Sequence, residues 1–504
     1  MGELADALHR HPMFRARKGR VRAETFQLFG VGCAGRLSPA LDYEFDVVVI
    51  GAGPAGEIAA GRLATRGHRR VAIVERDLVG GECSFYACMP SKALLRPQEV
   101  LDEARRVPGA VQAISGGLDV QAVLDRRDEV VNNLDDSHQL PWLEDRGIKL
   151  FRGTARLDGE LRVRVDDDLL VAREAVVIAT GSTAAMPTIP GLADAGAWSN
   201  RQITTAKQVP PRLTILGGGV VGVEMAQAWA SLGAQVTVIE AQASLIGNEE
   251  PFAGEQVADG LRKIGVDIRL GAKATAVSRG DTAVTVELDD GSSVTGERLL
   301  VAVGREPLTG GIGLPTVGLA DGGFIEVEDT LEVPGHPWLY AVGDANGRSL
   351  LTHAGKYQAR IAADRILGHT DARAVADGAA TPRVIFTDPQ VAAVGLTLAA
   401  ALDAGLPAVA VDLPTGSSAG SAFIGHGTSN SSRFVVDRER EVLVGVTLVG
   451  PSVAESLHAA SIAVAAQVPL ARLTHAIAPF PTRSELWLSF LEKYERDQDV
   501  SLHR

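Results

Sequence analysis

GGECSFYACMPSK, at residues 80–92, holds two of the three cysteines of the 504-residue chain. Cys83 and Cys88 are far enough apart to close a small disulfide ring if the segment begins a distorted helix. Gly80 and Gly81 have no Cβ atom, so the backbone before the first cysteine can approach a flat cofactor closely. The spacing therefore predicts a redox-active dithiol beside a bound nucleotide cofactor.

Lys92 lies one helical turn after Cys88 and is expected on the same face of the helix. A nearby ammonium group and the helix N-terminus both favour a thiolate over a thiol. Two alternatives stay open, a chance pair of buried cysteines and half of a metal site. A metal site would need a second cysteine pair or histidines, and the third cysteine, Cys33, stands alone in the sequence.

Residues 47–75 have the pattern of a dinucleotide-binding strand-helix-strand unit. An apolar run predicts a buried parallel strand, an alanine-rich segment predicts a helix, and a second apolar run ends in Glu75. Between strand and helix lie glycines for the tight turn, for access of a pyrophosphate and for close helix packing, namely Gly51, Gly53 and Gly56. Glu75 is placed to bind ribose hydroxyls.

A second unit of the same kind spans residues 213–240 and ends in Glu240. Its glycines are Gly217, Gly219 and Gly222. Two such units predict two bound dinucleotides. The carboxylate of Glu240 would accept hydrogen bonds from a free ribose 2′-hydroxyl and repel a 2′-phosphate, so NADH is favoured over NADPH.

These motifs together resemble the flavoprotein disulfide reductases, the family of dihydrolipoamide dehydrogenase, glutathione reductase and mercuric reductase. The likeness rests on the pattern Gly-Gly-x-Cys-x4-Cys-x-Pro-Ser-Lys and runs from Tyr43 to about Tyr494. It implies FAD in the first unit, a nicotinamide nucleotide in the second and a homodimer. The implied fold class is α/β, with two Rossmann-like dinucleotide-binding domains and an α+β C-terminal dimerisation domain.

The resemblance also predicts domain boundaries. An N-terminal extension at 1–42 precedes an FAD-binding domain in two parts, 43–190 and 307–379. The NAD(P)-binding domain at 191–306 is inserted between them, and the dimerisation domain covers 380–504. The extension contains Asp and Glu and no apolar core, so we expect neither a transit peptide nor a secretory signal there.

Further segments resemble the family's functional sites. The resemblance assigns cofactor contacts to Gly81, Thr180, Gly181, Gly304, Asp344 and Thr352. Asp344, at a strand end, would bind the ribityl chain of FAD. Cys88 would be the flavin-proximal thiolate, and Cys83 the outer thiol that meets the acceptor. Lys92 and Glu224 resemble an ion pair beside the flavin, and the alternative is that both are ordinary surface charges.

The chain departs from the family pattern at Phe480. Disulfide-reducing members have His-Pro-Thr-x-x-Glu where this sequence reads FPTRSE, ending in Glu485. Phenylalanine carries no proton, and general acid-base assistance is typically worth about 10²–10⁴ in rate. Val220, in place of an aromatic residue after the second glycine turn, resembles the mercuric reductase branch, but the tail 492–504 lacks that branch's cysteine pair.

The composition is that of an ordinary globular protein, with 46% apolar and 22% charged residues. The formal net charge of −13 argues against a nucleic-acid partner. The longest apolar stretch, 459–471, is shorter than a membrane span requires. The low cysteine count fits a reducing compartment, so we expect a cytoplasmic protein.

We therefore expect an NAD(P)H-dependent FAD oxidoreductase with a redox-active Cys83–Cys88 disulfide and no metal site. Electrons would pass from NADH through FAD to a small-molecule or small-protein acceptor, which is a disulfide, a quinone or a metal ion. One alternative is a dihydrolipoamide dehydrogenase, against which the missing histidine speaks. The other is a flavin-bound redox-sensing or scaffold subunit with little turnover.

Overall fold

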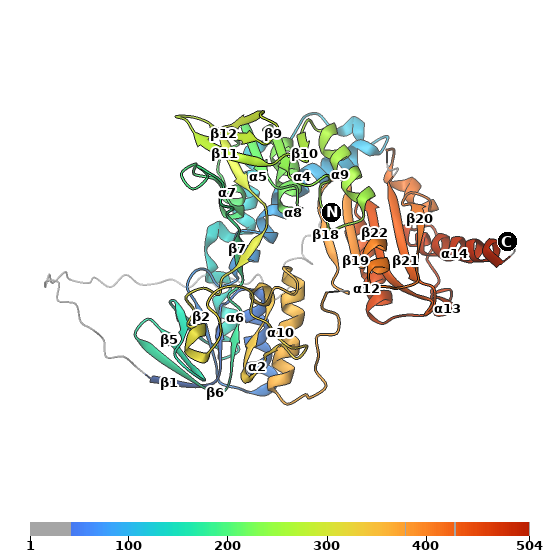
Figure 1. Ribbon diagram of the computed structural model, residues 1–504. Helices are drawn as coiled ribbons and strands as arrows, with labels where there is room; N and C mark the ends of the chain where they lie inside the picture. Colours follow the sequence, from blue (N-terminus) through green and yellow to red (C-terminus); the bar gives the residue numbers. More distant parts are fainter. Residues whose placement is uncertain (1–41, 379, 428–429, 503–504) are drawn as a thin grey trace, which may run out of the picture. The chain divides into compact units, whose positions relative to one another are not determined.

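The structure is a computed structural model that describes residues 42–378, 380–427 and 430–502. The expectations for the N-terminal extension and for Cys33 concern residues before 42, which lie outside these ranges. The described residues form five sheets, three of which carry the helices that position the candidate site (Figure 1).

The first sheet has eight strands, and its parallel part runs in the order β17-β6-β1-β2-β3. Full burial of Val47, Val48 and Val49 explains the uninterrupted apolar run of the first strand. Three short strands pair antiparallel at its margins. The strands are β1 (Asp42–Ile50), β2 (Val71–Glu75), β3 (Lys149–Arg152), β4 (Ala155–Leu157), β5 (Arg162–Val165), β6 (Asp168–Ile178), β16 (Glu332–Val333) and β17 (His336–Ala341).

Helices α2 (Pro54–Gly67) and α10 (Thr352–Ile366) pack side by side against this sheet (Figure 1). Small residues set their close approach, since a Cβ atom on Gly355 would lie 3.4 Å from that of Ala55. Further along, Arg62 on α2 donates two hydrogen bonds of 2.6 Å to Asp364 on α10. The contact of the small residues and the Arg62–Asp364 pair therefore both fix how α2 and α10 are aligned along each other.

The second parallel sheet has the order β10-β9-β8-β14. A three-stranded antiparallel sheet belongs to the same part of the chain. A separate two-stranded antiparallel sheet forms where the chain leaves the first unit and later re-enters it. The strands are β7 (Ser182–Ala184), β8 (Arg212–Leu216), β9 (Gln235–Glu240), β10 (Asp267–Leu270), β11 (Ala274–Arg279), β12 (Val284–Leu288), β13 (Ser293–Gly296), β14 (Arg298–Val301) and β15 (Arg305–Pro307). The helices of this part are α7 (Asn200–Thr205), α8 (Val220–Ser231) and α9 (Pro251–Lys263).

The third large sheet is antiparallel throughout, in the order β18-β19-β22-β21-β20. Phe434 on β21 stacks on Phe490 of the last helix, with ring centres 4.3 Å apart. The elements are β18 (Arg383–Ile385), β19 (Gln390–Gly395), α11 (Leu398–Asp403), β20 (Ala408–Pro414), β21 (Ser431–Asp437), β22 (Val442–Gly450), α12 (Leu457–Ala465), α13 (Leu470–Leu473) and α14 (Leu486–Leu502). The predicted fold class, two Rossmann-like units followed by an α+β unit, is confirmed.

Among the helices in the described ranges, none combines the length and the apolarity that crossing a membrane requires. The same residues include no group of three or more His, Cys, Asp or Glu side chains placed to hold a metal ion.

Candidate redox and cofactor site

The two cysteines of the dithiol segment lie on consecutive helices. Cys83 is inside α3 (Gly81–Phe85), and Cys88 opens α4 (Cys88–Arg106). Ala87 separates the helices because its φ of −133° and ψ of −93° are not helical. Gly81, with a φ of 59°, has no room for a side chain, since a Cβ atom there would lie 2.8 Å from Cα of Gly53. The dithiol segment therefore packs directly against the first glycine turn.

Both cysteines are free thiols in this structure and are partly buried. Two free thiols are the state that such a pair reaches after taking up two electrons. The hydroxyl oxygen of Thr352 lies 3.4 Å from Sγ of Cys88.

The two thiols differ strongly in acidity. Hydrogen bonding with Cys83, and then with Thr352, outweighs burial and lowers the pKa of the Cys88 thiol to about 6, with Lys92 adding to the effect. The bond to Cys88 and burial together raise the pKa of the Cys83 thiol. At neutral pH the arrangement thus holds a Cys88 thiolate beside a protonated Cys83.

Lys92 is held by a buried carboxylate. Its Nζ atom lies 2.7 Å from Oε2 of Glu224, whose residue is 3% exposed. The other oxygen of Glu224 accepts the backbone N–H of Phe386 at 3.0 Å. Nζ of Lys92 also lies 4.7 Å from the centre of the Phe386 ring, a cation–π distance. These contacts join α4, α8 and the segment after β18 behind the dithiol.

A cleft in front of the dithiol gathers most of the residues that the sequence assigned to FAD. The predicted residues that line it are Gly51, Gly53, Glu75, Gly81, Cys83, Thr180, Gly181, Asp344 and Thr352. Gly56 lies just behind it, where a Cβ atom would come within 1.9 Å of the carbonyl oxygen of Gly51. Gly304 does not line the cleft, although its neighbour Arg305 does.

The residues of this cleft fit a dinucleotide. Helix α2 has no side chain bonded to its N-terminal N–H groups, which leaves them available for a phosphate. Thr180 carries a buried hydroxyl that has no partner within the described part of the chain. Because buried hydroxyls normally form hydrogen bonds, a group bound in the cleft would satisfy it.

The second glycine turn repeats this construction. A Cβ atom on Gly217 would lie 2.3 Å from the carbonyl oxygen of Ala302, and one on Gly222 would lie 1.9 Å from that of Gly217. Gly219 precedes α8, whose N-terminus also lacks a side-chain cap. Oε2 of Glu240 accepts the N–H of Gly218 at 2.5 Å. The two glycine turns therefore share one arrangement, with close backbone contacts at the glycines and a helix N-terminus that has no side-chain cap.

Two polar clusters around the cleft were not identified from the sequence. In the first, Glu82 accepts hydrogen bonds from Arg201 and from Asn200, the latter at 2.7 Å, and so anchors α3 to α7. In the second, Asp344 accepts the hydroxyl of Ser182, and burial raises the pKa of Asp344. Arg305 could have been identified from the sequence, because it directly follows Gly304 in a motif that resembles the family's. No local sequence pattern singles out Arg201.

Phe480 and Glu485 do not line this cleft in their own chain. Phe480 is 76% exposed, next to Ile477, which is 93% exposed. Oε2 of Glu485 is buried and has no hydrogen-bond partner within 42–378, 380–427 and 430–502. The structure therefore places the departure from the family motif on an exposed apolar part of the C-terminal unit.

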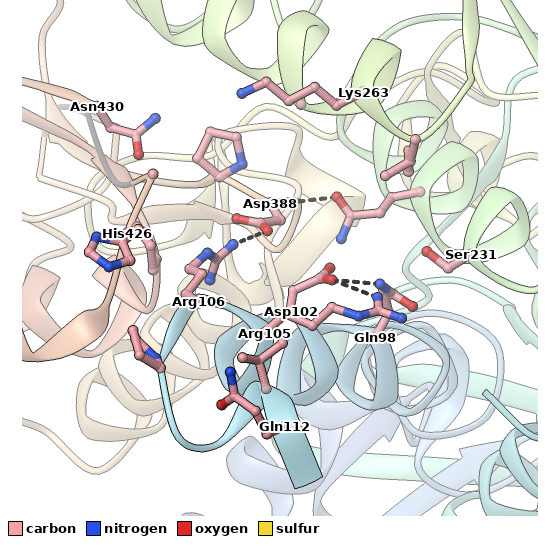
Figure 2. Close-up of a pocket in the computed structure, with 18 residues that line it drawn as sticks. Gln98, Asp102, Arg105, Arg106, Gln112, Ser231, Lys263, Asp388, His426 and Asn430 are labelled. Carbon is pink, nitrogen blue, oxygen red and sulfur yellow. Dashed lines mark hydrogen bonds and ion pairs between the residues drawn. The ribbon is translucent and has the colours of Figure 1, made fainter. Parts of the chain in front are cut away.

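A second cavity, of about 580 Å³, lies between α4, α8, α9 and the segment around His426 (Figure 2). Arg105, Arg106 and Lys263 face it from the last turns of α4 and α9, where cations offset the negative ends of the helix dipoles. Arg106 pairs with Asp388, and Arg105 lies 3.2 Å from a carboxylate of α4. The positions of these side chains at helix ends and in ion pairs explain their charges without a ligand. The cleft beside the dithiol is therefore the candidate site.

Comparison with known proteins agrees with this geometry. The family model described as pyridine nucleotide-disulphide oxidoreductase matches residues 45–359, and the model of the dimerisation domain of the same family matches residues 381–489. The chain belongs to the pyridine nucleotide-disulphide oxidoreductase family. It is therefore an FAD-dependent, NAD(P)H-using enzyme with a dimerisation domain, as the sequence motifs predicted.

Relatives of several activities are similar to this family member. A dihydrolipoyl dehydrogenase of Haloferax volcanii is 32% identical over 455 residues, which cover 87% of this chain and 94% of the relative. A mercuric reductase of Staphylococcus aureus is 28% identical and covers 88% of this chain and 81% of its own. The Cu(II) complex of the HOCl-induced flavoprotein disulfide reductase RclA from Escherichia coli has a TM-score of 0.78 at 26% identity, covering 89% and 99% of the two chains.

Proposed function

We propose that this enzyme uses NADH and FAD to reduce the Cys83–Cys88 pair, which then reduces an acceptor that needs no proton from the protein. The observation that carries the proposal is the pairing of a stabilised Cys88 thiolate with a phenylalanine, Phe480, at the position of the family's acid-base histidine. We further propose that the enzyme acts as a homodimer, in which Phe480 of one subunit faces Cys83 of the other, and that it works in the cytoplasm.

The residues of the chain have distinct roles in this proposal. The glycine turn at Gly51 and the N-terminus of α2 would hold the pyrophosphate of FAD, and Glu240 would bind the ribose of NADH. When bound there, FAD and NADH supply the hydride and electron transfer that reduces the disulfide. Thr352 and Lys92 favour the thiolate of Cys88, Glu224 holds Lys92 in place, and Cys83 meets the acceptor.

With a disulfide as acceptor, the exchange is balanced as follows. The Cys88 thiolate takes the proton of Cys83, and Sγ of Cys83 then attacks one sulfur of the acceptor, so that the first thiolate leaves. Cys88 gives that proton to solvent, and its Sγ attacks Sγ of Cys83, which releases the second thiolate and forms the Cys83–Cys88 disulfide. Two electrons from NADH restore the dithiol. Without a histidine, both thiolates leave unprotonated, which favours acceptors whose thiols have a low pKa.

Quinones and metal ions also need no proton from the enzyme at the moment of transfer. A metal acceptor is supported by the similarity to a mercuric reductase and to a relative described as a Cu(II) complex. Dihydrolipoamide dehydrogenase is the second candidate, since a relative of that name covers 87% of the chain. A redox-sensing subunit with little turnover is the third.

Anaerobic titration with NADH tests the dithiol role. The wild type should take up two electron pairs, one on the flavin and one on the cysteines, whereas Cys83→Ser and Cys88→Ser should take up one. Cys33→Ser is the matched control and should behave as the wild type. An unchanged titration in both active-site variants would show that the pair is structural.

Steady-state NADH oxidation separates the three candidates. We expect turnover with a quinone or a low-pKa disulfide, and weak turnover with lipoamide and glutathione disulfide. Lipoamide turnover at ordinary enzyme rates would favour the dehydrogenase, and no turnover with any acceptor would favour the sensor.

A further inference from the structure

Two polar groups of α8 line the second cavity and lack a hydrogen-bond partner. Gln227 and Ser231 lie four residues apart, on successive turns of the helix and on the same side of it. Gln227 is 4% exposed, and its Oε1 atom accepts the backbone N–H of Asp388 at 2.6 Å. Its Nε2 atom therefore stays free, since it donates to no residue in the described ranges.

Oγ of Ser231 is also buried and has no partner in the part of the chain that the structure describes (Figure 2). Buried polar groups normally form hydrogen bonds, and an unpaired one destabilises the fold by about 1–3 kcal/mol. Helix ends and ion pairs explain the charges of the cavity, but they do not explain these two groups. Both therefore point to a molecule that occupies the cavity.

The charges of the cavity leave one cation in excess. Apart from His426, the ionisable side chains that line it are three cations and two carboxylates, namely Arg105, Arg106, Lys263, Asp102 and Asp388. Arg106 pairs with Asp388, and Arg105 pairs with Asp102. Lys263, at the end of α9, is exposed and forms no ion pair within residues 42–378, 380–427 and 430–502. The excess charge favours an anion over a neutral or cationic molecule.

The cavity also offers apolar contacts. Its apolar lining residues are Pro108, Val111, Ile264, Pro389 and Pro451. Its volume of about 580 Å³ is within the range of small-molecule sites, about 300–1,000 Å³. Such sites combine apolar contacts with a few polar groups that fix the orientation of the ligand.

The cavity is separate from the cofactor cleft, because no described residue lines both. Helix α4 begins at Cys88 and reaches the cavity with its last turns. Helix α8 begins after the second glycine turn and reaches the cavity at Gln227 and Ser231. A molecule bound in the cavity would therefore leave the dithiol and both glycine turns free.

We propose that this cavity binds a small organic anion, a carboxylate carried on an apolar body. Gln227 and Ser231 would donate hydrogen bonds to the carboxylate, and Lys263 would offset its charge. The inference goes beyond the proposed function and holds for any electron acceptor. The competing interpretation is that ordered water fills the cavity and satisfies both polar groups.

Two probes of the same shape and different charge distinguish these interpretations. They are para-iodobenzoate, an anion, and para-iodobenzamide, which is neutral. In soaked crystals of the FAD-loaded enzyme, the anomalous signal of iodine should locate the carboxylate in the cavity. In solution, with saturating NAD⁺, we expect the carboxylate to bind with a Kd of about 0.1–1 mM and the amide to bind about fivefold more weakly.

Three variants locate the binding measured in solution. Ser231→Ala should weaken the carboxylate about fivefold, the effect of one hydrogen bond, and Lys263→Gln about threefold, the effect of one exposed charge. Gln227→Glu keeps an oxygen for the N–H of Asp388 and replaces the free donor by a negative charge, so binding should weaken more than about tenfold. Lys149→Gln, on an exposed residue of β3, is the matched control and should bind as the wild type.

An iodine site in the cavity together with weaker binding in these variants supports the proposal. Water alone in the cavity of the soaked crystals overturns it, as does binding in solution that the variants leave unchanged. Equal affinity for the carboxylate and the amide overturns the anionic class of the ligand. Ser231→Ala and Lys263→Gln remove groups without partners in the described fold, so they decide the question even if Gln227→Glu does not fold.

Discussion

Glu75 and Glu240 occupy equivalent positions in the two dinucleotide-binding units. Oε2 of Glu75 accepts the N–H of Ala52 at 2.7 Å, and Oε1 accepts that of Asp77 at 2.8 Å. Glu240 makes the same two bonds to Gly218, at 2.5 Å, and to Gln242, at 2.7 Å. Each carboxylate therefore ties its own strand end to its glycine turn and still has lone pairs for a ribose.

This relationship predicts the nicotinamide preference and a way to change it. In Glu240→Gln the amide oxygen can still accept a backbone N–H, but the negative charge that repels a 2′-phosphate is lost. We expect kcat/KM for NADPH to rise about tenfold relative to NADH, which corresponds to about 1.4 kcal/mol. Rapid-mixing reduction by the two nucleotides measures the ratio.

Glu75→Gln is the matched control for that experiment, because it makes the same change in the other unit. It should weaken FAD retention and leave the ratio of NADH to NADPH rates as in the wild type. A ratio that shifts equally in both variants would contradict separate roles for the two carboxylates.

The Cys88 thiolate gives a second prediction. Its pKa of about 6 means that the thiolate, and any long-wavelength absorbance it produces with the flavin, should disappear as the pH falls through about 6. Removing the hydroxyl in Thr352→Val should move the midpoint upward by roughly half to one pH unit, the effect of one hydrogen bond. Thr352→Ser keeps the hydroxyl and should titrate as the wild type. A midpoint that is the same in the valine and serine variants would contradict the contact.

The two dinucleotide-binding units could be predicted from the sequence because local residue patterns specify them. The run at Val47, the glycine turns and the terminal acids specify each strand-helix-strand unit within about thirty residues, so no long-range information is needed. The antiparallel C-terminal sheet has no such motif. The resemblance predicted only an α+β C-terminal domain, and the structure confirms that class.

The site was less predictable where its contacts join distant segments. Arg201 reaches Glu82 across more than a hundred residues, and Glu57 lies opposite Lys356 only because α2 and α10 pack together. Neither pair has a local signature.

Glu57 gives a prediction about stability. Burial raises its pKa from an ordinary 4.5 to about 7, so between these values the folded state binds more protons than the unfolded state. Folding stability from this group is fully present below about pH 4.5 and is lost as the pH rises through about 7. Glu57→Gln cannot ionise and should unfold at a higher temperature than the wild type at about pH 8, with a gain of roughly 1–3 kcal/mol.

The comparison should be made at two pH values. Near pH 4 the variant and the wild type should differ little, because Glu57 is then mostly protonated in both the folded and the unfolded state. Glu129→Gln removes an exposed carboxylate of α5 (Val120–Val130) and should shift the unfolding temperature equally at both pH values. A Glu57→Gln variant that is less stable than the wild type at about pH 8 would show that the carboxylate is stabilising as it stands.

Phe480→His tests whether the lost histidine decides the acceptor. Glu485 has a buried Oε2 atom without a partner in the described residues, so an imidazole introduced nearby would find an acceptor ready to orient it. If Phe480 faces the partner's Cys83 in the dimer, the new histidine can protonate a departing thiolate. We expect turnover of lipoamide to rise about tenfold, the lower part of the range for general acid-base assistance, and turnover of a quinone to stay within about twofold. Phe480→Leu keeps the position apolar and should leave both rates near those of the wild type. If the Leu variant gains as much lipoamide turnover as the His variant, the size of the Phe480 ring, and not proton transfer, limits disulfide reduction.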